Sequence, residues 1–210
     1  MHINEFFKTP IWSEQKPEFV KSLTKATNKY IKAARIRDKK VIKATKDFGN
    51  SHHSTPLIQD NDFLDFRNYI GQKSWEFLDH HGYDMKQYTT LFSEMWVQEF
   101  AKKGGGHHSA HIHWNQHVSG FYFLKASEKT SMPVFHEPRT GARATKLKMK
   151  PELTKIVNGT ELVHFKPQPG ILLIFPGYLE HEFSVDYGVE PFRFIHWNIT
   201  AIPKEMAKDV

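Results

Sequence analysis

Three histidines stand close together in the stretch SAHIHWNQHVSGFYFL, residues 109–124. His111 and His113 are separated by one residue, and alternate side chains of a β-strand point to the same side. On a strand this pair would chelate one metal ion, because imidazole suits first-row metals and two ligands need only a third from elsewhere. The chain has no cysteine, so any metal must be bound by histidine, aspartate or glutamate. His117 is a competing candidate from the same stretch.

A second feature is an arginine within an apolar run. Arg193 lies in PFRFIHWNI, residues 191–199, among aromatic and aliphatic side chains. A buried guanidinium group is costly unless it meets an anion. That anion is either a carboxylate of the protein or the carboxylate of a ligand held by the planar guanidinium. Upstream, His181 follows the Pro-Gly break in FPGYLEH and stands at the start of another short apolar run.

The elements that position these residues change character along the chain. Apolar residues recur at three- and four-residue steps over residues 17–46 and 63–82, which predicts two helices. After them the period becomes two, and many short strands at such spacing are typical of a barrel or sandwich. The polar and basic region 140–158 is interpreted as a loop or lid. The predicted strands cover residues 90–100, 111–114, 118–124, 132–136, 161–165, 171–175, 181–185 and 192–200.

We therefore expect a mainly β protein with N-terminal helices (α+β). A length of 210 residues and a hydrophobic fraction of 39% favour one folded domain over residues 1–210. Within it, residues 1–87 form a mainly helical support region, and residues 88–204 form the β core that carries the candidate site.

The net charge of +6 is unevenly distributed. Residues 16–47 contain eleven basic and three acidic side chains, which is either a solvated helix face, the interpretation we favour, or a patch for nucleic acid. The longest apolar run, ILLIF, is far shorter than the roughly 20 residues that span a bilayer, so no membrane segment is expected. The N-terminus has no signal-peptide pattern, and the lack of cysteine fits a cytoplasmic location.

Taken in order, several motifs carry a family resemblance. They are HIH, then SGFYFL, then EPR, then PGILLIFPGYLEH, then an arginine twelve residues later in a strand that ends in WN. Together they resemble the Fe(II)- and 2-oxoglutarate-dependent dioxygenases, and more narrowly a prolyl-hydroxylase-like branch with an HxH, H and R pattern. The resemblance covers about residues 88–200, and PIW at residues 10–12 is similar to the N-terminus of that branch. The individual motifs are weak, and their order and spacing make the combination specific.

The resemblance implies a double-stranded β-helix, a jelly-roll or cupin-like barrel, with Fe(II) at one open end. Its metal ligands would be His111, His113 and His181. The usual first motif of the family is His-x-Asp/Glu, so His113 stands where a carboxylate is expected. An alternative is that His111 and His181 hold iron with water in the third place, as in the aspartyl/asparaginyl hydroxylases. We favour all three histidines, because a strand would aim His113 at the same space.

The implied enzyme is a hydroxylase that decarboxylates 2-oxoglutarate to succinate while it oxidises a substrate C–H bond with O2. Arg193 would pair with the distal carboxylate of 2-oxoglutarate, and Tyr122 is a candidate second contact whose alternative is an ordinary core tyrosine. The implied partners are 2-oxoglutarate, O2 and a small-molecule or protein substrate. Nucleic acid is not favoured as the substrate, because RFIHWNIT lacks a second arginine after the first.

Two other functions are also compatible with the sequence. A cupin-like metal-binding protein would share the barrel and the histidines without oxygenase activity, and it would not need Arg193 to meet 2-oxoglutarate. A nucleic-acid-binding protein would use the basic helix at residues 16–47, and its binding would weaken steeply with salt and survive removal of metal.

Overall fold

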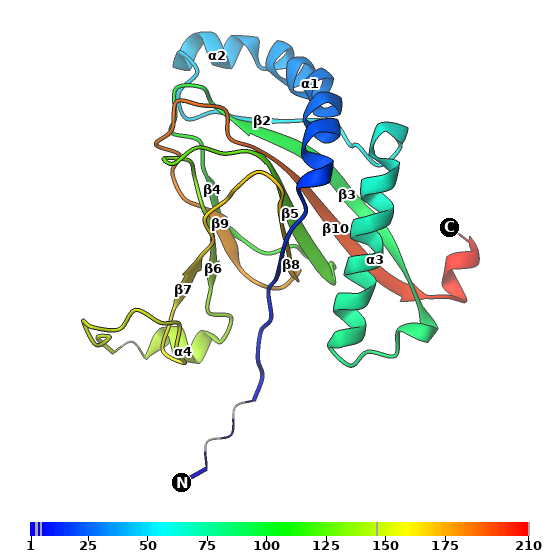
Figure 1. Cartoon of the computed structure of the whole chain (residues 1–210), viewed down its shortest axis with the longest axis vertical. Coiled ribbons are helices and arrows are strands. Elements are labelled where there is room, and N and C mark those ends of the chain that lie inside the picture. The colour runs from blue at the N-terminus through cyan, green and yellow to red at the C-terminus, as the bar shows by residue number, and fades with distance from the viewer. Residues whose placement is uncertain (3, 5, 146, 210) are drawn as a thin grey trace.

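The computed structural model describes residues 1–2, 4, 6–145 and 147–209. Two antiparallel sheets face each other, and helices cover the outer face of the larger sheet (Figure 1). The helices are α1 (Val20–Arg37), α2 (Lys39–Thr45), α3 (Leu64–His80) and the short α4 (Thr140–Ala144). The 3-10 turns are η1 (Pro17–Phe19), η2 (Asn61–Phe63), η3 (Met85–Gln87) and η4 (Met206–Asp209).

The strands divide into a six-stranded and a four-stranded sheet. The larger sheet has the order β1-β8-β5-β10-β3-β2, and the smaller sheet has the order β4-β9-β6-β7. This pair of sheets is typical of a double-stranded β-helix, so the predicted fold class, mainly β with N-terminal helices, is confirmed. The strands are β1 (Trp12–Gln15), β2 (Ser51–His53), β3 (Tyr88–Phe100), β4 (His108–His111), β5 (Val118–Lys125), β6 (Pro133–His136), β7 (Leu162–His164), β8 (Ile171–Pro176), β9 (His181–Phe183) and β10 (Arg193–Pro203).

The central strands of the larger sheet are buried on both faces. On β10, Ile195 and Trp197 pack in the core formed with the helices, whereas Phe194 belongs to a second core between the sheets. Strand β5 alternates in the same way, with Tyr122 on the helix side and Phe121 on the inter-sheet side. This alternation decides which side chains of these strands can approach the histidines.

The helical predictions agree with the structure, with one division. The segment predicted over 17–46 forms η1, α1 and α2, and the axis breaks at Asp38. Helix α1 buries an apolar stripe of Leu23, Ile31 and Ala34, so most of its basic residues lie on the solvent side. None of the helices in the described part of the chain is long and apolar enough to cross a membrane.

Three local differences from the predicted elements bear on the site. Strand β1 was not predicted, because it is only four residues long and three of them are exposed. Residues 140–158, interpreted as a loop, begin with α4. The strand predicted over 111–114 lies earlier, as β4, and ends at His111. His113 therefore follows the strand instead of lying on it.

Gly120 provides a test of the packing between β5 and β10. A Cβ atom at this position would lie 2.1 Å from a carbon of the Trp197 ring, and Trp197 is fully buried. Gly120→Ala should therefore lower the free energy of unfolding by about 1–3 kcal/mol or more, measured by urea denaturation. Gly141→Ala is the matched control, because its Cβ would meet nothing within 4 Å. Equal stability of the two variants would contradict this packing.

Candidate metal centre

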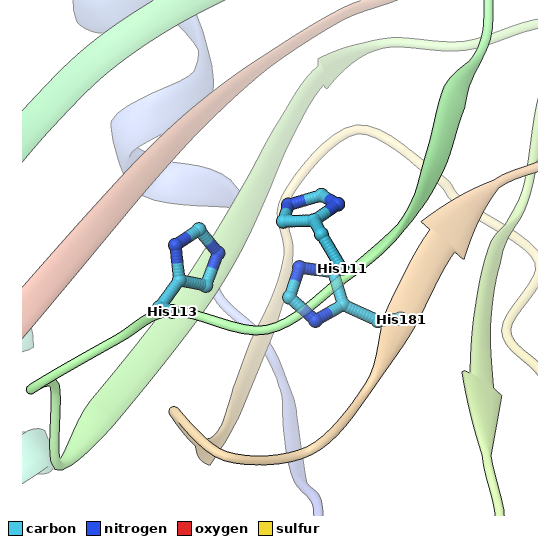
Figure 2. A group of neighbouring side chains, drawn as sticks. All are labelled: His111, His113 and His181. Atoms are coloured by element: carbon cyan, nitrogen blue, oxygen red, sulfur yellow. The ribbon is translucent and has the colours of Figure 1, made fainter.

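Three histidines, two at strand ends and one in the loop after β4, converge between the sheets. Figure 2 shows the rings of His111, His113 and His181 turned toward one another. One nitrogen from each lies within 4.8 Å of the others, a spacing that could hold one metal ion. The ring centroids of His111 and His181 are 4.5 Å apart, and each is 5.1 Å from that of His113. The structure thus brings together all three histidines singled out in the sequence.

Backbone pairing positions each of these side chains. His111 ends β4 and is the direct register partner of His181, which begins β9. His113 is placed differently from the prediction, because the strand has already ended. Its backbone N–H donates to the carbonyl of Gly177, 2.9 Å away in the turn before His181. A loop-to-loop hydrogen bond, not the alternation of one strand, therefore brings His113 to the site.

Hydrogen bonds to backbone carbonyls set the proton positions of two of these rings. His111 donates from Nδ1 to the carbonyl of Ser109 at 2.7 Å, and His181 donates from Nδ1 to that of Leu179 at 2.8 Å. A carbonyl oxygen only accepts, so Nδ1 carries the proton and Nε2 keeps its lone pair. Both rings are thus in the tautomer that binds metal through Nε2.

Burial keeps the imidazoles of His113 and His181 neutral. Burial lowers the pKa of His181 to about 3, and that of His113 to about 4, since a dry environment disfavours the charged form. Phe121, Phe135 and Phe175 lie around the His181 ring at centroid distances of 5.6, 6.0 and 4.9 Å. A neutral imidazole is the form that a metal ion needs.

The residues present fit a metal ion. The Nε2 atoms of His113 and His181 are buried and have no hydrogen-bond partner among the described residues. Buried polar atoms are nearly always satisfied, so two such atoms facing a third imidazole fit a site that binds a metal ion. A set of neutral nitrogen donors suits a first-row transition metal.

A second group of potential ligands adjoins the first and was not found from the sequence. Glu94, His113 and His196 also place one ligand atom each within 4.8 Å of one another. Asn198 lies among them, because its Nδ2 donates to Glu94 Oε2 and to His113 Nδ1, each at 3.0 Å. The signal that could have found these residues is polar side chains recurring every second position along two otherwise apolar strands.

Arg193 is not brought to the histidines. It shares the helix-facing side of β10 with Ile195 and Trp197, and its register partner on β3 is Glu99. The guanidinium donates to Glu99 Oε2 from Nη2 at 2.6 Å and from Nε at 2.9 Å, and it also reaches Asn28 Oδ1 on α1 at 2.8 Å. Both side chains of the ion pair are at most 5% exposed. Of the two anions left open by the sequence, the structure places the protein carboxylate beside Arg193.

Tyr122 also faces away from the histidines. It packs against Phe66 of α3 with ring centroids 4.9 Å apart, and its hydroxyl donates to the carbonyl of Lys16 at 2.6 Å. Its place in the core with the helices follows from the alternation along β5, which turns Phe121 toward the site instead. The structure therefore corrects the placement expected for both candidate cosubstrate residues.

Polar side chains lie further into the barrel along β3. Gln98 is the register partner of Phe194, and its Nε2 approaches both Ser51 Oγ and His108 Nε2. Its Oε1 is buried without a partner in the described part of the protein. Burial lowers the pKa of His108 to about 4, so this cluster is uncharged at neutral pH.

Comparison with known proteins gives a family match over the region that holds the site. Residues 94–191 match the profile of a family described as "Putative 2OG-Fe(II) oxygenase". This segment contains His111, His113 and His181 and ends two residues before Arg193. No curated protein sequence matches the chain.

Solved structures share the fold at low sequence identity. The viral collagen prolyl hydroxylase vCPH of Paramecium Bursaria Chlorella virus-1 is 15% identical, with a TM-score of 0.56 over 91% of this chain and 96% of its own. AviO1 of Streptomyces viridochromogenes is 11% identical, with a TM-score of 0.58 over 91% and 90%. A Burkholderia pseudomallei oxidoreductase of the 2OG-Fe(II) oxygenase family is 12% identical, and the chain spans 58% of its length at a TM-score of 0.47. At these identities the likeness to vCPH and AviO1 concerns the fold alone.

The ion pair of Arg193 can be tested by its effect on stability. Arg193→Ala should lower the free energy of unfolding by about 3–5 kcal/mol, because the Glu99 carboxylate stays buried without its partner. Metal binding at the histidines should persist. The double variant Arg193→Met/Glu99→Leu should recover most of the lost stability in urea denaturation, since both charges leave together. A fully stable Arg193→Ala protein with weakened 2-oxoglutarate binding would instead support Arg193 as the residue that binds the distal carboxylate of 2-oxoglutarate.

Proposed function

We propose that His111, His113 and His181 hold the Fe(II) of an oxygenase of the 2OG-Fe(II) family, whose profile matches residues 94–191. The observation that supports the proposal is the convergence of three imidazoles whose facing nitrogens are largely unpartnered among the described residues. A three-histidine set leaves half of an octahedral coordination sphere open. Members of this family use Fe(II) with 2-oxoglutarate and O2, and the positions left open by three histidines would be available to both.

The chain's own residues would contribute binding, orientation and exclusion of water. When bound, iron and 2-oxoglutarate supply the oxidation of a substrate C–H bond with release of succinate and CO2. The carbonyls of Ser109 and Leu179 hold two rings with their lone pairs toward the ion. The phenylalanines around His181 keep water from the inner side of the site.

We further propose that Gln98 and His108 receive the distal carboxylate of 2-oxoglutarate in place of Arg193. Gln98 is fully buried, and the ring of His108 lies beside that of His111 with centroids 6.1 Å apart. The Gln98 amide now directs Nε2 to Ser51 and His108, and by turning over it would present its N–H groups to the carboxylate, which accepts strong hydrogen bonds. The neutral ring of His108 can add a donor from one nitrogen.

The substrate would approach over the two loops that meet at the metal centre. Trp114 directly follows His113 and is 79% exposed, and Tyr178 directly follows Gly177 and is 56% exposed. Large exposed aromatic side chains beside a site are suited to hold a small-molecule or protein substrate. The basic face of α1 lies beyond the helix-covered side of the larger sheet, so it would not present a bound nucleic acid to the histidines.

The test is an anaerobic titration of the protein with Fe(II) and 2-oxoglutarate. A weak visible charge-transfer band, followed by succinate formation when air is admitted, would support the proposal. Absence of both would contradict it and favour a metal-binding protein of the same fold without oxygenase activity.

His181→Ala should abolish Fe(II) binding, because His181 is the most buried of the three ligands and is already in the ligand tautomer. His117→Ala is the matched control from the same histidine-rich stretch, since His117 bonds Thr200 and not the other histidines. Calorimetric titration with Fe(II) under anaerobic conditions distinguishes the two. Equal affinity in both variants would remove His181 from the ligand set.

Gln98→Leu should weaken 2-oxoglutarate binding by about tenfold or more while Fe(II) binding is retained, because a hydrogen bond to a charged group is lost. Gln72→Leu, on the exposed surface of α3, is the control. The charge-transfer band, followed as a function of 2-oxoglutarate concentration, gives the 2-oxoglutarate affinity of each variant. Calorimetric titration with Fe(II) gives the metal affinity. An unchanged affinity in Gln98→Leu would place the distal carboxylate elsewhere.

A further inference from the structure

The four imidazoles at the metal centre and beside it differ in how their protons are placed. His111, His181 and His196 each donate from Nδ1 to a backbone carbonyl, that of His196 being Gly120 at 3.1 Å. Each of these rings therefore presents an Nε2 lone pair. Among the described residues His113 makes no such contact with a carbonyl, and its Nδ1 faces the side-chain amide of Asn198 at 3.0 Å.

The orientation of the Asn198 amide follows from its other neighbours. The Asn198 group that faces His113 also lies 3.0 Å from Glu94 Oε2, and an ionised carboxylate only accepts hydrogen bonds. That group must therefore be the NH2 of the amide, and its Oδ1 accepts from Ser119 Oγ at 2.5 Å. Asn198 and Ser119 are fully buried, so other partners are limited.

This orientation dictates the tautomer of His113. Because Asn198 donates to Nδ1, that nitrogen has no proton, and in a neutral imidazole the proton must then be on Nε2. Figure 2 shows that one ring nitrogen of His113 is directed toward His111 and His181 while the other is directed away from them. The nitrogen that contacts Asn198 is Nδ1, and the buried nitrogen left without a partner in the described structure is Nε2.

We propose that Glu94, acting through Asn198, holds the metal-free His113 in the tautomer that cannot bind a metal ion, so that His113 becomes a ligand only when the Asn198 amide turns over. The proposal rests on the function proposed above insofar as His113 is a ligand. Glu94 and Asn198 are then positioning residues that determine when the third ligand is available.

The chemistry of metal uptake explains why Glu94 opposes it. When Nε2 binds an ion, the proton of a neutral ring must be on Nδ1, which then needs an acceptor. A turned Asn198 amide supplies Oδ1 to that proton, and the Ser119 hydroxyl can accept from the amide as readily as it donated. The turned Oδ1, however, also faces the Glu94 carboxylate, and two acceptors at hydrogen-bond distance repel each other.

Glu94→Gln separates this role from a simple effect of charge. A glutamine amide can donate to the turned Oδ1 of Asn198, so both amide orientations become acceptable. The variant should therefore bind metal more tightly even though it has lost a negative charge near a cation. If Glu94 acted only through its charge, the variant would bind metal more weakly than wild type. If Glu94 were a direct ligand, the metal affinity would decrease further.

The first measurement uses the metal-free protein and long-range 15N–1H NMR of the histidine rings, with His113 assigned by loss of its signals in His113→Phe. Wild-type His113 should show the Nε2–H tautomer, while His111 and His181 show Nδ1–H. In Glu94→Gln the His113 signals should shift toward Nδ1–H. An Nδ1–H tautomer for wild-type His113, or no shift in the variant, would overturn the proposal.

The second measurement is calorimetric titration with Co(II) as the probe. Glu94→Gln should bind about tenfold more tightly than wild type, which is the scale on which residues behind metal ligands act. The matched control is Glu182→Gln, since Glu182 adjoins His181 but lies toward His136. Glu182→Gln should bind Co(II) as tightly as wild type or more weakly. Weaker binding in Glu94→Gln would overturn the proposal. The NMR result needs no metal, so it stands even if the oxygenase test fails.

Discussion

The two-residue alternation of β5 and β10 is the constraint on which the rest of the molecule depends. Both strands lie in the middle of the six-stranded sheet, and each is buried on both faces. One set of side chains packs under α1 and α3, and the other set lines the space between the sheets. A shift of one residue in either strand would exchange the two sets of that strand, and such a shift in β10 would take His196 and Asn198 away from the metal centre.

This constraint explains how much could be predicted from the sequence. The change from helical to strand periodicity and the paired histidines follow from local pattern, whereas the role of the later His181 came from the family resemblance. The fold class agrees with the structure. When a strand is apolar on both faces, the sequence indicates a strand but does not tell which alternate residues face which side of the sheet. The pattern therefore could not tell that Arg193 and Tyr122 face the helices, whereas Phe194 and Phe121 face the site.

The position of His113 was predictable only in part. Its spacing from His111 suggested a strand, and the structure brings its ring to the expected place by a different route, the hydrogen bond to Gly177. Glu94, His196 and Asn198 were missed because each lies on a strand distant in sequence from the histidine motif. Their meeting depends on the register between β3 and β10, which no local pattern contains.

The short strand β1 has a consequence for the behaviour of the chain in concentrated solution. It covers the outer side of β8, whose run of Ile171–Phe175 would otherwise end the larger sheet with unpaired backbone groups. An exposed apolar edge of this kind is a template for pairing between molecules. The Tyr122 hydroxyl, bonded to Lys16 just after β1, helps keep this cover in place. A tyrosine expected to contact the cosubstrate thus helps to hold the strand that covers this edge.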